Sequence, residues 1–208
     1  MELKGNTILI TGATSGIGLA FAEEFYRLDN KVIICGRRED RLQELAKKHP
    51  GMIAIVCDVS LEKDRRDLFN RVKTEHPGVN ILMNNAGVQF AASLHEEINT
   101  EKLLKETETN FMAPIHLCSL FSTFLAKQKD PAIINISSGL AFTPIAFMPV
   151  YCATKAGIHS FTLSLRYQLK NTPVKVFEIA PPSVDTELGH DRRADKSQSH
   201  GGIPVSEF

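Results

Sequence analysis

A tyrosine and a lysine stand four positions apart at Tyr151 and Lys155, with two serines upstream at Ser137 and Ser138. On a helix, positions i and i+4 share a face, so the phenol and the ammonium can point into one site. A free phenol has a pKa of about 10, and a neighbouring cation favours the phenolate, so this pair could exchange protons closer to neutral pH. The alternative is an ordinary surface helix, because two residue types at one spacing recur by chance. The motifs in the rest of the sequence distinguish a proton-exchanging pair from an ordinary surface helix.

A glycine-rich turn near the start of the chain, TGATSGIG at residues 11–18, follows a β-branched run and opens a helical pattern. Glycines let the backbone turn sharply and approach a ligand, while the helix N-terminus offers unpaired amides and a positive dipole end to a pyrophosphate. The G-x-x-x-G-x-G spacing differs from the commoner G-x-G-x-x-G but occupies the same strand, turn and helix position. We therefore predict dinucleotide binding, the alternative being a turn without a ligand.

The end of the second predicted strand carries Gly36, Arg37 and Arg38. In this position a carboxylate would accept the ribose 2′-hydroxyl of NAD, whereas an arginine would pair with the 2′-phosphate of NADP. The missing carboxylate and the two arginines favour NADP, with NAD possible because Glu39 or Asp40 could still reach the ribose. The alternative is that both arginines merely face water.

Short β-branched runs alternate with longer helical patterns along the chain. Strands are predicted at residues 6–11, 31–35, 52–57, 80–84, 132–136 and 174–179, and helices at 16–28, 39–48, 61–75, 100–126 and 150–170. Apolar strands separated by helices predict a parallel sheet covered on both faces, with right-handed crossovers. The fold class is therefore α/β, a three-layer αβα, doubly wound and Rossmann-like sheet in the order 3-2-1-4-5-6. Residues 1–186 are predicted as one dinucleotide-binding and catalytic domain, and 187–208 as a polar loop or tail of that domain.

Composition narrows the class of protein. The 208 residues include 24 Lys plus Arg and 24 Asp plus Glu, interspersed, so neither a nucleic-acid partner nor a membrane partner is expected. The N-terminus lacks a signal-peptide pattern and no apolar run approaches the roughly 18 residues of a membrane span, so a cytoplasmic protein is predicted. The four cysteines stand singly, without zinc spacing, and are predicted to be buried thiols; no metal site is expected.

Four motifs together resemble the short-chain dehydrogenase/reductase family, in its single-domain branch. They are the turn at residues 11–18, Asn84-Asn85-Ala86-Gly87 after the fourth strand, Ser138, and Tyr151-x-x-x-Lys155. The resemblance spans residues 5 to 186. Within the family, residues 139–142, 149–156 and 180–182 resemble the DltE-type oxidoreductases of Gram-positive bacteria. This closer resemblance does not supply a substrate.

The resemblance implies a catalytic role for four residues. Ser138, rather than Ser137 on the opposite side of the extended chain, would hydrogen-bond the substrate oxygen and stabilise charge that develops there. Tyr151 would be the general acid in carbonyl reduction and the general base in alcohol oxidation. Lys155 would lower the pKa of Tyr151 and bind the nicotinamide ribose. Asn110 would position a water that joins the lysine to solvent, the alternative being a polar residue that satisfies its own helix backbone.

The resemblance also implies a set of cofactor contacts. These are Gly12, Thr14, Ser15, Gly16, Ile17 and Gly18 in the turn, Gly36, Arg37 and Arg38 after the second strand, Asp58 and Val59 after the third, Asn85, Ala86 and Gly87 after the fourth, Ile136 beneath the nicotinamide, Tyr151 and Lys155, and Pro181, Val184 and Thr186 after the last strand. The family's usual Pro-Gly is here Pro181-Pro182, so a residue free in its backbone angles becomes one fixed near a φ of about −65°.

Family members commonly continue beyond this point into a substrate lid, a final helix and a seventh strand, whereas this sequence ends at Phe208. We therefore expect either a truncated form or a sheet that ends at its sixth strand and lacks the family's final strand. In both cases we expect a homodimer formed through the long helix and the Tyr151 helix rather than a tetramer.

The predicted function is that of an NADP-preferring oxidoreductase that interconverts a carbonyl and a secondary alcohol by hydride transfer, with a small-molecule carbonyl or alcohol as substrate. The alternative is a catalytically silent dinucleotide-binding sensor or scaffold, against which the intact Asn110, Ser138, Tyr151 and Lys155 argue. An apolar substrate pocket is predicted from Gln89, Leu140, Phe142, Phe147 and Met148.

Overall fold

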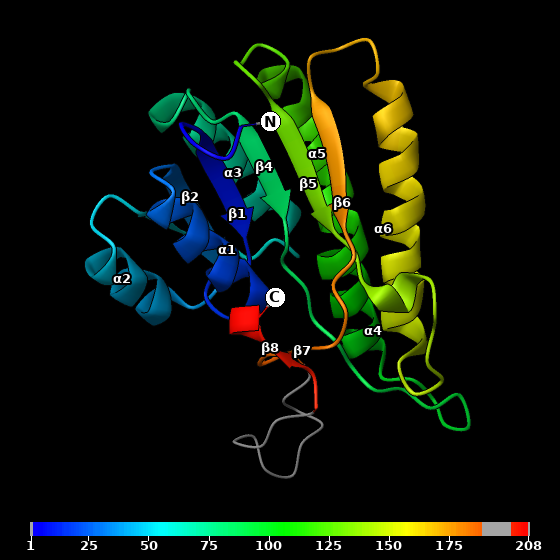
Figure 1. The fold of residues 1–208 in the computed structure, drawn as a ribbon. Coiled ribbons are helices and arrows are strands. Elements are labelled where there is room, and N and C mark those ends of the chain that lie inside the picture. The colour runs from blue at the N-terminus through cyan, green and yellow to red at the C-terminus, as the bar shows by residue number, and fades with distance from the viewer. Residues whose placement is uncertain (1, 189–200, 208) are drawn as a thin grey trace.

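Six parallel strands form the central sheet of the computed structural model, which describes residues 2–188 and 201–207 (Figure 1). They are β1 (Thr7–Thr11), β2 (Lys31–Gly36), β3 (Ile53–Val56), β4 (Ile81–Asn84), β5 (Ala132–Ile136) and β6 (Lys175–Ile179). Their order across the sheet is β3-β2-β1-β4-β5-β6, and every neighbouring pair is parallel. The predicted doubly wound α/β fold and its strand order are confirmed.

Helices cover both faces of this sheet, as Figure 1 shows. They are α1 (Gly16–Arg27), α2 (Glu39–Lys48), α3 (Glu62–Glu75), α4 (Thr100–Thr107), α5 (Ala113–Leu125) and α6 (Pro149–Gln168). One core forms against α1 and α2, and the other against α3, α5 and α6. Strand β1 supplies both cores, because Ile8 and Ile10 point to the α1 side while Leu9 points to the α3 side.

The helix predicted at residues 100–126 is interrupted. A π-helical turn, η1 (Glu108–Met112), separates α4 from α5. Pro114, at the start of α5, has no N–H to donate to the carbonyl of Asn110 four residues earlier, so the regular α-helical ladder cannot pass this point. The wider turn buries Thr109 and Asn110.

Residues 187–208 are predicted as a loop or tail, and part of this stretch forms secondary structure. β7 (Val184–Asp185) pairs in parallel with β8 (Ile203–Pro204), and the short 3-10 turn η4 (Val205–Glu207) packs against α1. A two-residue bridge carries no hydrophobic period that sequence reasoning could detect. Most of the predicted tail at 187–208 lies outside the described residues. Figure 1 shows β7 and β8 just beyond the carboxyl ends of the parallel strands.

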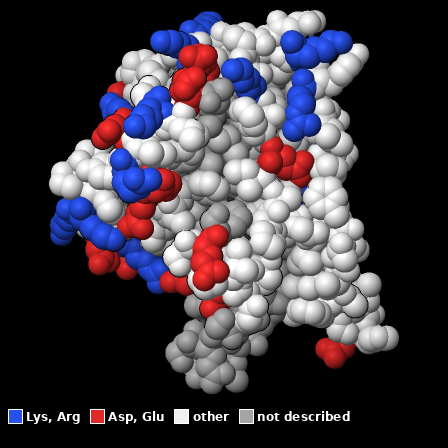
Figure 2. All heavy atoms as spheres, viewed as in Figure 1, with Lys and Arg blue, Asp and Glu red and all other residues white. Residues whose placement is uncertain are grey.

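The surface seen in Figure 2 carries Lys and Arg interspersed with Asp and Glu over α1 and α2, and few charges on the side formed by β6 and α6. Both signs are therefore mixed on this face, as their interspersed positions in the sequence predict. Within 2–188 and 201–207, none of the helices combines the length and apolar character needed to cross a membrane. All four cysteines are buried and free, which confirms the prediction of buried thiols.

Candidate active site

A cavity of about 1220 Å³ lies along the carboxyl ends of the strands. It spans the point between β1 and β4 where the strand order reverses, which is where open α/β sheets bind their ligands. Its walls come from the glycine turn, the ends of β2 to β5, helix α6 and the segment after β6. All of the predicted site residues line this cavity except Gly18 and Asn110.

The glycine turn adopts backbone conformations that require glycine. Gly12 and Gly16 have φ of +67° and +56°, in the left-handed region, and a Cβ on Gly12 would lie 2.6 Å from the Ala86 Cα. Gly18 lies behind the cavity, where a Cβ would meet the Asn85 Nδ2 at 2.2 Å. Gly18 therefore lets α1 pack closely on the end of β4, while Gly12 and Gly16 shape the wall of the cavity.

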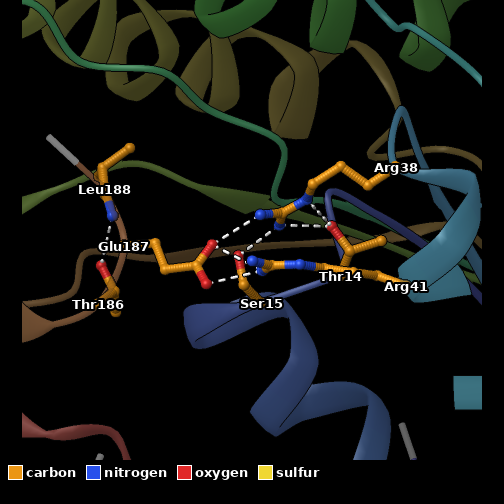
Figure 3. Close-up of polar contacts among 7 residues, drawn as sticks. All are labelled: Thr14, Ser15, Arg38, Arg41, Thr186, Glu187 and Leu188. Atoms are coloured by element: carbon orange, nitrogen blue, oxygen red, sulfur yellow. Dashed lines mark hydrogen bonds and ion pairs between the residues drawn. The ribbon is translucent and has the colours of Figure 1, made fainter. Parts of the chain in front are cut away.

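Arginines gather at the end of the cavity next to β2 (Figure 3). The Arg38 Nη2 donates to the hydroxyl oxygens of Thr14, at 2.6 Å, and Ser15, at 2.7 Å, and its Nη1 donates to the Glu187 carboxylate at 2.6 Å. The Arg41 Nη1 donates to both oxygens of the same carboxylate, at 2.7 and 2.8 Å. The sequence did not single out Arg41 or Glu187. The three-residue spacing from Arg38 on α2 could have indicated Arg41, because such positions share a helix face.

The other predicted residues of this end are also placed at the cavity. Arg37 is exposed, and Gly36 is buried with its Cα close enough to Thr14 that an added Cβ would lie 3.0 Å from the Thr14 Cγ2. The Asp58 Oδ1 accepts from the backbone N–H of Ser60 at 3.0 Å and from its hydroxyl at 2.7 Å. Asp58 is thereby fixed at the end of β3, with Val59 buried beside it.

Tyr151 and Lys155 both point from α6 into the cavity, as their spacing predicted, and are only 5% and 4% exposed. The Lys155 Nζ lies 5.7 Å from the centroid of the Tyr151 ring and donates to the Ile136 carbonyl oxygen at 2.9 Å. Burial lowers the pKa of Lys155 from 10.5 to about 8. Lys155 therefore loses its proton at a pH that is only slightly above neutral.

The two serines after β5 have different partners. The Ser138 Oγ accepts from the Leu140 backbone N–H at 3.1 Å, and Ser138 lines the cavity. The Ser137 backbone N–H and hydroxyl both donate to the Ile179 carbonyl oxygen, at 2.9 and 3.4 Å, which ties Ser137 to β6. Since the Ser138 oxygen accepts the Leu140 bond, its own proton can be donated to a ligand.

Asn110 lies behind the cavity and is 1% exposed. Its Oδ1 accepts from the Val88 N–H at 2.9 Å, and its Nδ2 donates to the Val88 carbonyl oxygen at 2.8 Å and to the Thr154 hydroxyl at 3.3 Å. A Cβ on Gly87 would lie 3.5 Å from the Asn110 Oδ1 and 3.8 Å from the Lys155 Nζ. Asn110 thus holds the loop after β4 and lies near Lys155, and it does not bond to its own helix backbone as the alternative reading required.

The segment after β6 closes one side of the cavity. The Pro181 carbonyl oxygen accepts from the Gly139 N–H at 2.9 Å, and a Cβ on Gly16 would lie 3.1 Å from the Thr186 Cβ. Pro181, Val184 and Thr186 therefore lie against the glycine turn and the strand β5 end, as a cofactor-lining segment would.

Four of the five residues predicted for the substrate pocket line the cavity: Gln89, Leu140, Phe147 and Met148. The fifth, Phe142, is 57% exposed, and its ring packs against the His159 ring at a centroid distance of 4.6 Å. It follows the 3-10 turn η2 (Gly139–Ala141), which directs it outward. Sequence reasoning also missed Asn99, Glu101, Lys102 and Lys105, which line the cavity from the start of α4, because the path of the loop after β4 has no sequence period.

The cavity combines a glycine turn at a helix N-terminus and two arginines at one end with a serine hydroxyl, a phenol and a buried amine at the other. Such a pair of ends suits an elongated, phosphate-bearing cofactor whose reactive part meets a group that needs a proton. Within the described part of the chain, no three or more His, Cys, Asp or Glu residues come together in a way that could hold a metal ion.

Comparison with known proteins gives consistent matches. The sequence profile of the short chain dehydrogenase family matches residues 6–197. An uncharacterized oxidoreductase, DltE of Bacillus subtilis (strain 168), is 45% identical over 211 residues, covering 100% of this chain and 83% of the relative.

Solved structures match over nearly the whole chain as well. A short-chain dehydrogenase from Sphingobium yanoikuyae in complex with NADPH has a TM-score of 0.88 at 26% identity, covering 98% of this chain and 80% of that one. A short chain dehydrogenase/reductase from Burkholderia phymatum in complex with NAD has a TM-score of 0.87 at 26% identity, covering 93% and 71%.

Proposed function

The chain belongs to the short-chain dehydrogenase family of oxidoreductases, and we propose that it is an NADP-preferring enzyme that interconverts a carbonyl and a secondary alcohol. The observation that carries this proposal is that Ser138, Tyr151 and Lys155 line the same cavity as the glycine turn and Arg38. The resemblance to DltE-type oxidoreductases, predicted from sequence, is confirmed by the similarity to the Bacillus subtilis protein.

The residues present fit a dinucleotide. The Gly12 to Gly18 turn and the N-terminus of α1 would hold the pyrophosphate, and Asp58 would meet the adenine end. Arg38 and Arg41 would bind a 2′-phosphate, since paired guanidinium groups suit a phosphate dianion, and Gly36 places no carboxylate at the end of β2 to repel it. The structural relatives bound to NADPH and to NAD support a nicotinamide cofactor of either kind, and the arginines favour NADP. When bound, the nicotinamide would supply or accept the hydride.

Ser138 and Tyr151 would handle the substrate oxygen. The Ser138 hydroxyl, with its proton free of the Leu140 bond, would donate to that oxygen and stabilise the negative charge that grows on it during reduction. The Tyr151 phenol would give its proton to the same oxygen, and in the reverse direction its phenolate would remove the proton of the alcohol.

Lys155 would make the phenol a better acid. A protonated ammonium beside the ring stabilises the phenolate, so the Tyr151 proton is released more readily. Asn110 would fix the loop after β4 near Lys155 through its two bonds to Val88 and would, as the family resemblance implies, position a water that supplies protons to the lysine.

The substrate end of the cavity supports a small carbonyl or alcohol with apolar character. Leu140, Phe147 and Met148 provide apolar walls, and Gln89 is a polar group that could orient a substrate.

We also propose a homodimer in the cytoplasm. The helices expected at its interface carry exposed apolar side chains, namely Leu104, Met112, Leu163 and Tyr167, which association would cover. Four buried, free thiols fit a reducing compartment. Sedimentation of a stable tetramer would contradict the dimer.

The proposal that the protein is an enzyme is tested by incubating the purified chain with NADPH and a panel of ketones and diketones. Both the consumption of NADPH and the identity of the alcohol product are measured. Turnover with at least one carbonyl supports the proposal. Tight NADPH binding without turnover on any carbonyl or alcohol would support the sensor or scaffold instead.

A further inference from the structure

The Glu187 carboxylate lies between the two arginines that form the proposed phosphate site. Its Oε2 accepts from Arg38 at 2.6 Å, and both of its oxygens accept from Arg41 (Figure 3). The same Arg38 guanidinium donates to the hydroxyls of Thr14 and Ser15 in the glycine turn. A carboxylate therefore occupies the position in which the guanidinium groups of Arg38 and Arg41 converge, and Arg38 links this position to the turn.

Carboxylates and phosphates are both anions that accept paired hydrogen bonds from an arginine guanidinium. The guanidinium groups of Arg38 and Arg41 cannot bind the Glu187 carboxylate and a phosphate in the same position at the same time. The competing carboxylate belongs to the same chain. Glu187 is 149 residues from Arg38 in the sequence, and the fold brings the two side chains together.

We propose that Glu187 is an internal counter-ion that fills the 2′-phosphate site of the empty enzyme, and that NADP(H) must displace it in order to bind. The inference rests on the proposed function, because it assigns that arginine site to the 2′-phosphate. It makes Glu187 a residue that determines cofactor affinity and selectivity, although it lies outside the glycine turn and outside the strand end that normally sets this choice.

The placement of the neighbouring residues shows what the displacement would move. Glu187 directly follows Thr186, whose side chain lies against Gly16, and β7, whose Val184 and Asp185 pair with β8. All residues from 182 to 188 except Asp185 line the cavity, and Glu187 bonds to Arg41 of α2. The segment therefore runs from the end of β6 to α2. Releasing Glu187 would remove its ion pairs with Arg38 and Arg41 and leave the β7–β8 pair in place.

Charge sets the direction of the competition. Burial raises the pKa of Glu187, but the hydrogen bonds and charges of Arg38 and Arg41 outweigh burial and lower the pKa to about 2. The carboxylate is therefore ionised throughout the physiological pH range. The pair is half-exposed, with side-chain exposure of 38–40%, and exposed ion pairs are weak, so a phosphate of higher charge should displace the single carboxylate. NADH, which has no 2′-phosphate, leaves the carboxylate in place.

The test compares the Glu187→Gln variant with the wild type by calorimetric titration of 2′,5′-ADP and 5′-AMP, two probes that differ only in the 2′-phosphate. Glutamine keeps the shape of the side chain and removes the charge. We expect Glu187→Gln to bind 2′,5′-ADP and NADPH roughly 3- to 10-fold more tightly, with 5′-AMP and NADH changed less than twofold. The matched control is Glu44→Gln, which removes an equal charge from an exposed position on α2 and should change none of the four affinities.

Equal or weaker binding of 2′,5′-ADP by Glu187→Gln would overturn the inference, provided that circular dichroism and thermal melting show a folded variant. If the wild type binds 2′,5′-ADP tightly and Arg38→Leu weakens it while Glu187→Gln does not strengthen it, only the Glu187 inference fails. If neither the wild type nor Glu187→Gln binds 2′,5′-ADP or NADPH, the arginine site itself is wrongly assigned and both proposals fail.

Discussion

The Lys155 ammonium donates a hydrogen bond of 2.9 Å to the Ile136 carbonyl oxygen, so helix α6 is tied to the carboxyl end of β5. Through this bond the cation is fixed next to the strand end that leads to Ser138 and beside the ring of Tyr151. The same burial that fixes it removes its hydration and lowers its pKa to about 8. Lys155 therefore affects both the free energy of unfolding and the protonation of the site.

Lys155→Met is expected to stabilise the fold at neutral pH. The pKa of Lys155 falls from 10.5 in the unfolded chain to about 8 in the folded one. Below pH 8 this shift lowers the free energy of unfolding by roughly 3 kcal/mol. The lost hydrogen bond to Ile136 offsets roughly 1 kcal/mol of the gain, so we expect a net gain of about 2 kcal/mol at pH 7 by denaturant unfolding.

The pH dependence of this gain follows from proton binding. Between pH 8 and 10.5 the unfolded chain holds the lysine proton and the folded chain does not, so wild-type stability rises with pH and its difference from the variant closes. Lys73→Met, at an exposed position on α3, is the control and should show no such change. A difference between Lys155→Met and the wild type that is the same at pH 7 and pH 10 would show that the buried cation is not its cause.

Arg38→Leu is expected to weaken NADPH binding by roughly 10- to 100-fold, the effect of losing hydrogen bonds from a charged group, with little change for NADH. Fluorescence titration of each cofactor measures both values. Arg37→Leu is the matched control, since Arg37 is exposed while Arg38 bonds to Thr14 and Ser15, and we expect a smaller effect from it. Equal losses for NADPH and NADH in Arg38→Leu would mean that Arg38 does not read the 2′-phosphate.

Gly36→Asp would be the more obvious test of cofactor choice, because it restores the carboxylate that NAD enzymes use. In this structure the substitution would also disturb a second contact at the site. An added Cβ lies 3.0 Å from the Thr14 Cγ2, so the Thr14 side chain, whose hydroxyl accepts from Arg38, would have to move by a few tenths of an ångström. Arg38→Leu changes the recognition of the phosphate without this contact.

Gly18→Ala is expected to destabilise the fold by about 1–3 kcal/mol, the range for forcing a methyl group into a packed site. The new Cβ would lie 2.2 Å from the Asn85 Nδ2 and 2.6 Å from the Gly12 carbonyl oxygen, which cannot move without opening the turn. The gain in helix propensity, about 1 kcal/mol at most, is smaller. Thermal melting measures the loss. Gly78→Ala, whose added Cβ would have its nearest neighbour 4.0 Å away, is the control and should be tolerated; an equal loss in both variants would contradict the packing role.

Much of the fold and the cavity could be predicted because each depends on a local pattern. Buried strands such as β5 read as apolar runs, the glycines of the turn have few other uses in that position, and the spacing of Tyr151 and Lys155 fixes a shared helix face. Parallel strands then bring their carboxyl ends, and the residues that follow them, to one edge of the sheet.

The parts that sequence reasoning missed depend on contacts between distant segments. The π-helical turn at Asn110 depends on one missing N–H, at Pro114, within a pattern that is otherwise helical. Phe142 looked like a pocket residue because it is apolar and close to Ser138, but a short 3-10 turn directs it to His159. Glu187 carries no local signal, since its role depends on Arg38, which precedes α2, and on Arg41 within α2.

The central claim, that Tyr151 transfers the proton in a carbonyl reductase, is tested most directly by Tyr151→Phe. With a carbonyl that the wild type reduces, we expect kcat/KM to fall by roughly 10²- to 10⁴-fold while NADPH affinity stays within about twofold, since only the hydroxyl is removed. Tyr167→Phe, at a residue 70% exposed on the same helix, keeps the apolar ring proposed for the dimer interface and should leave both values unchanged. Tyr151→Phe that turns over the substrate as fast as the wild type would contradict the account.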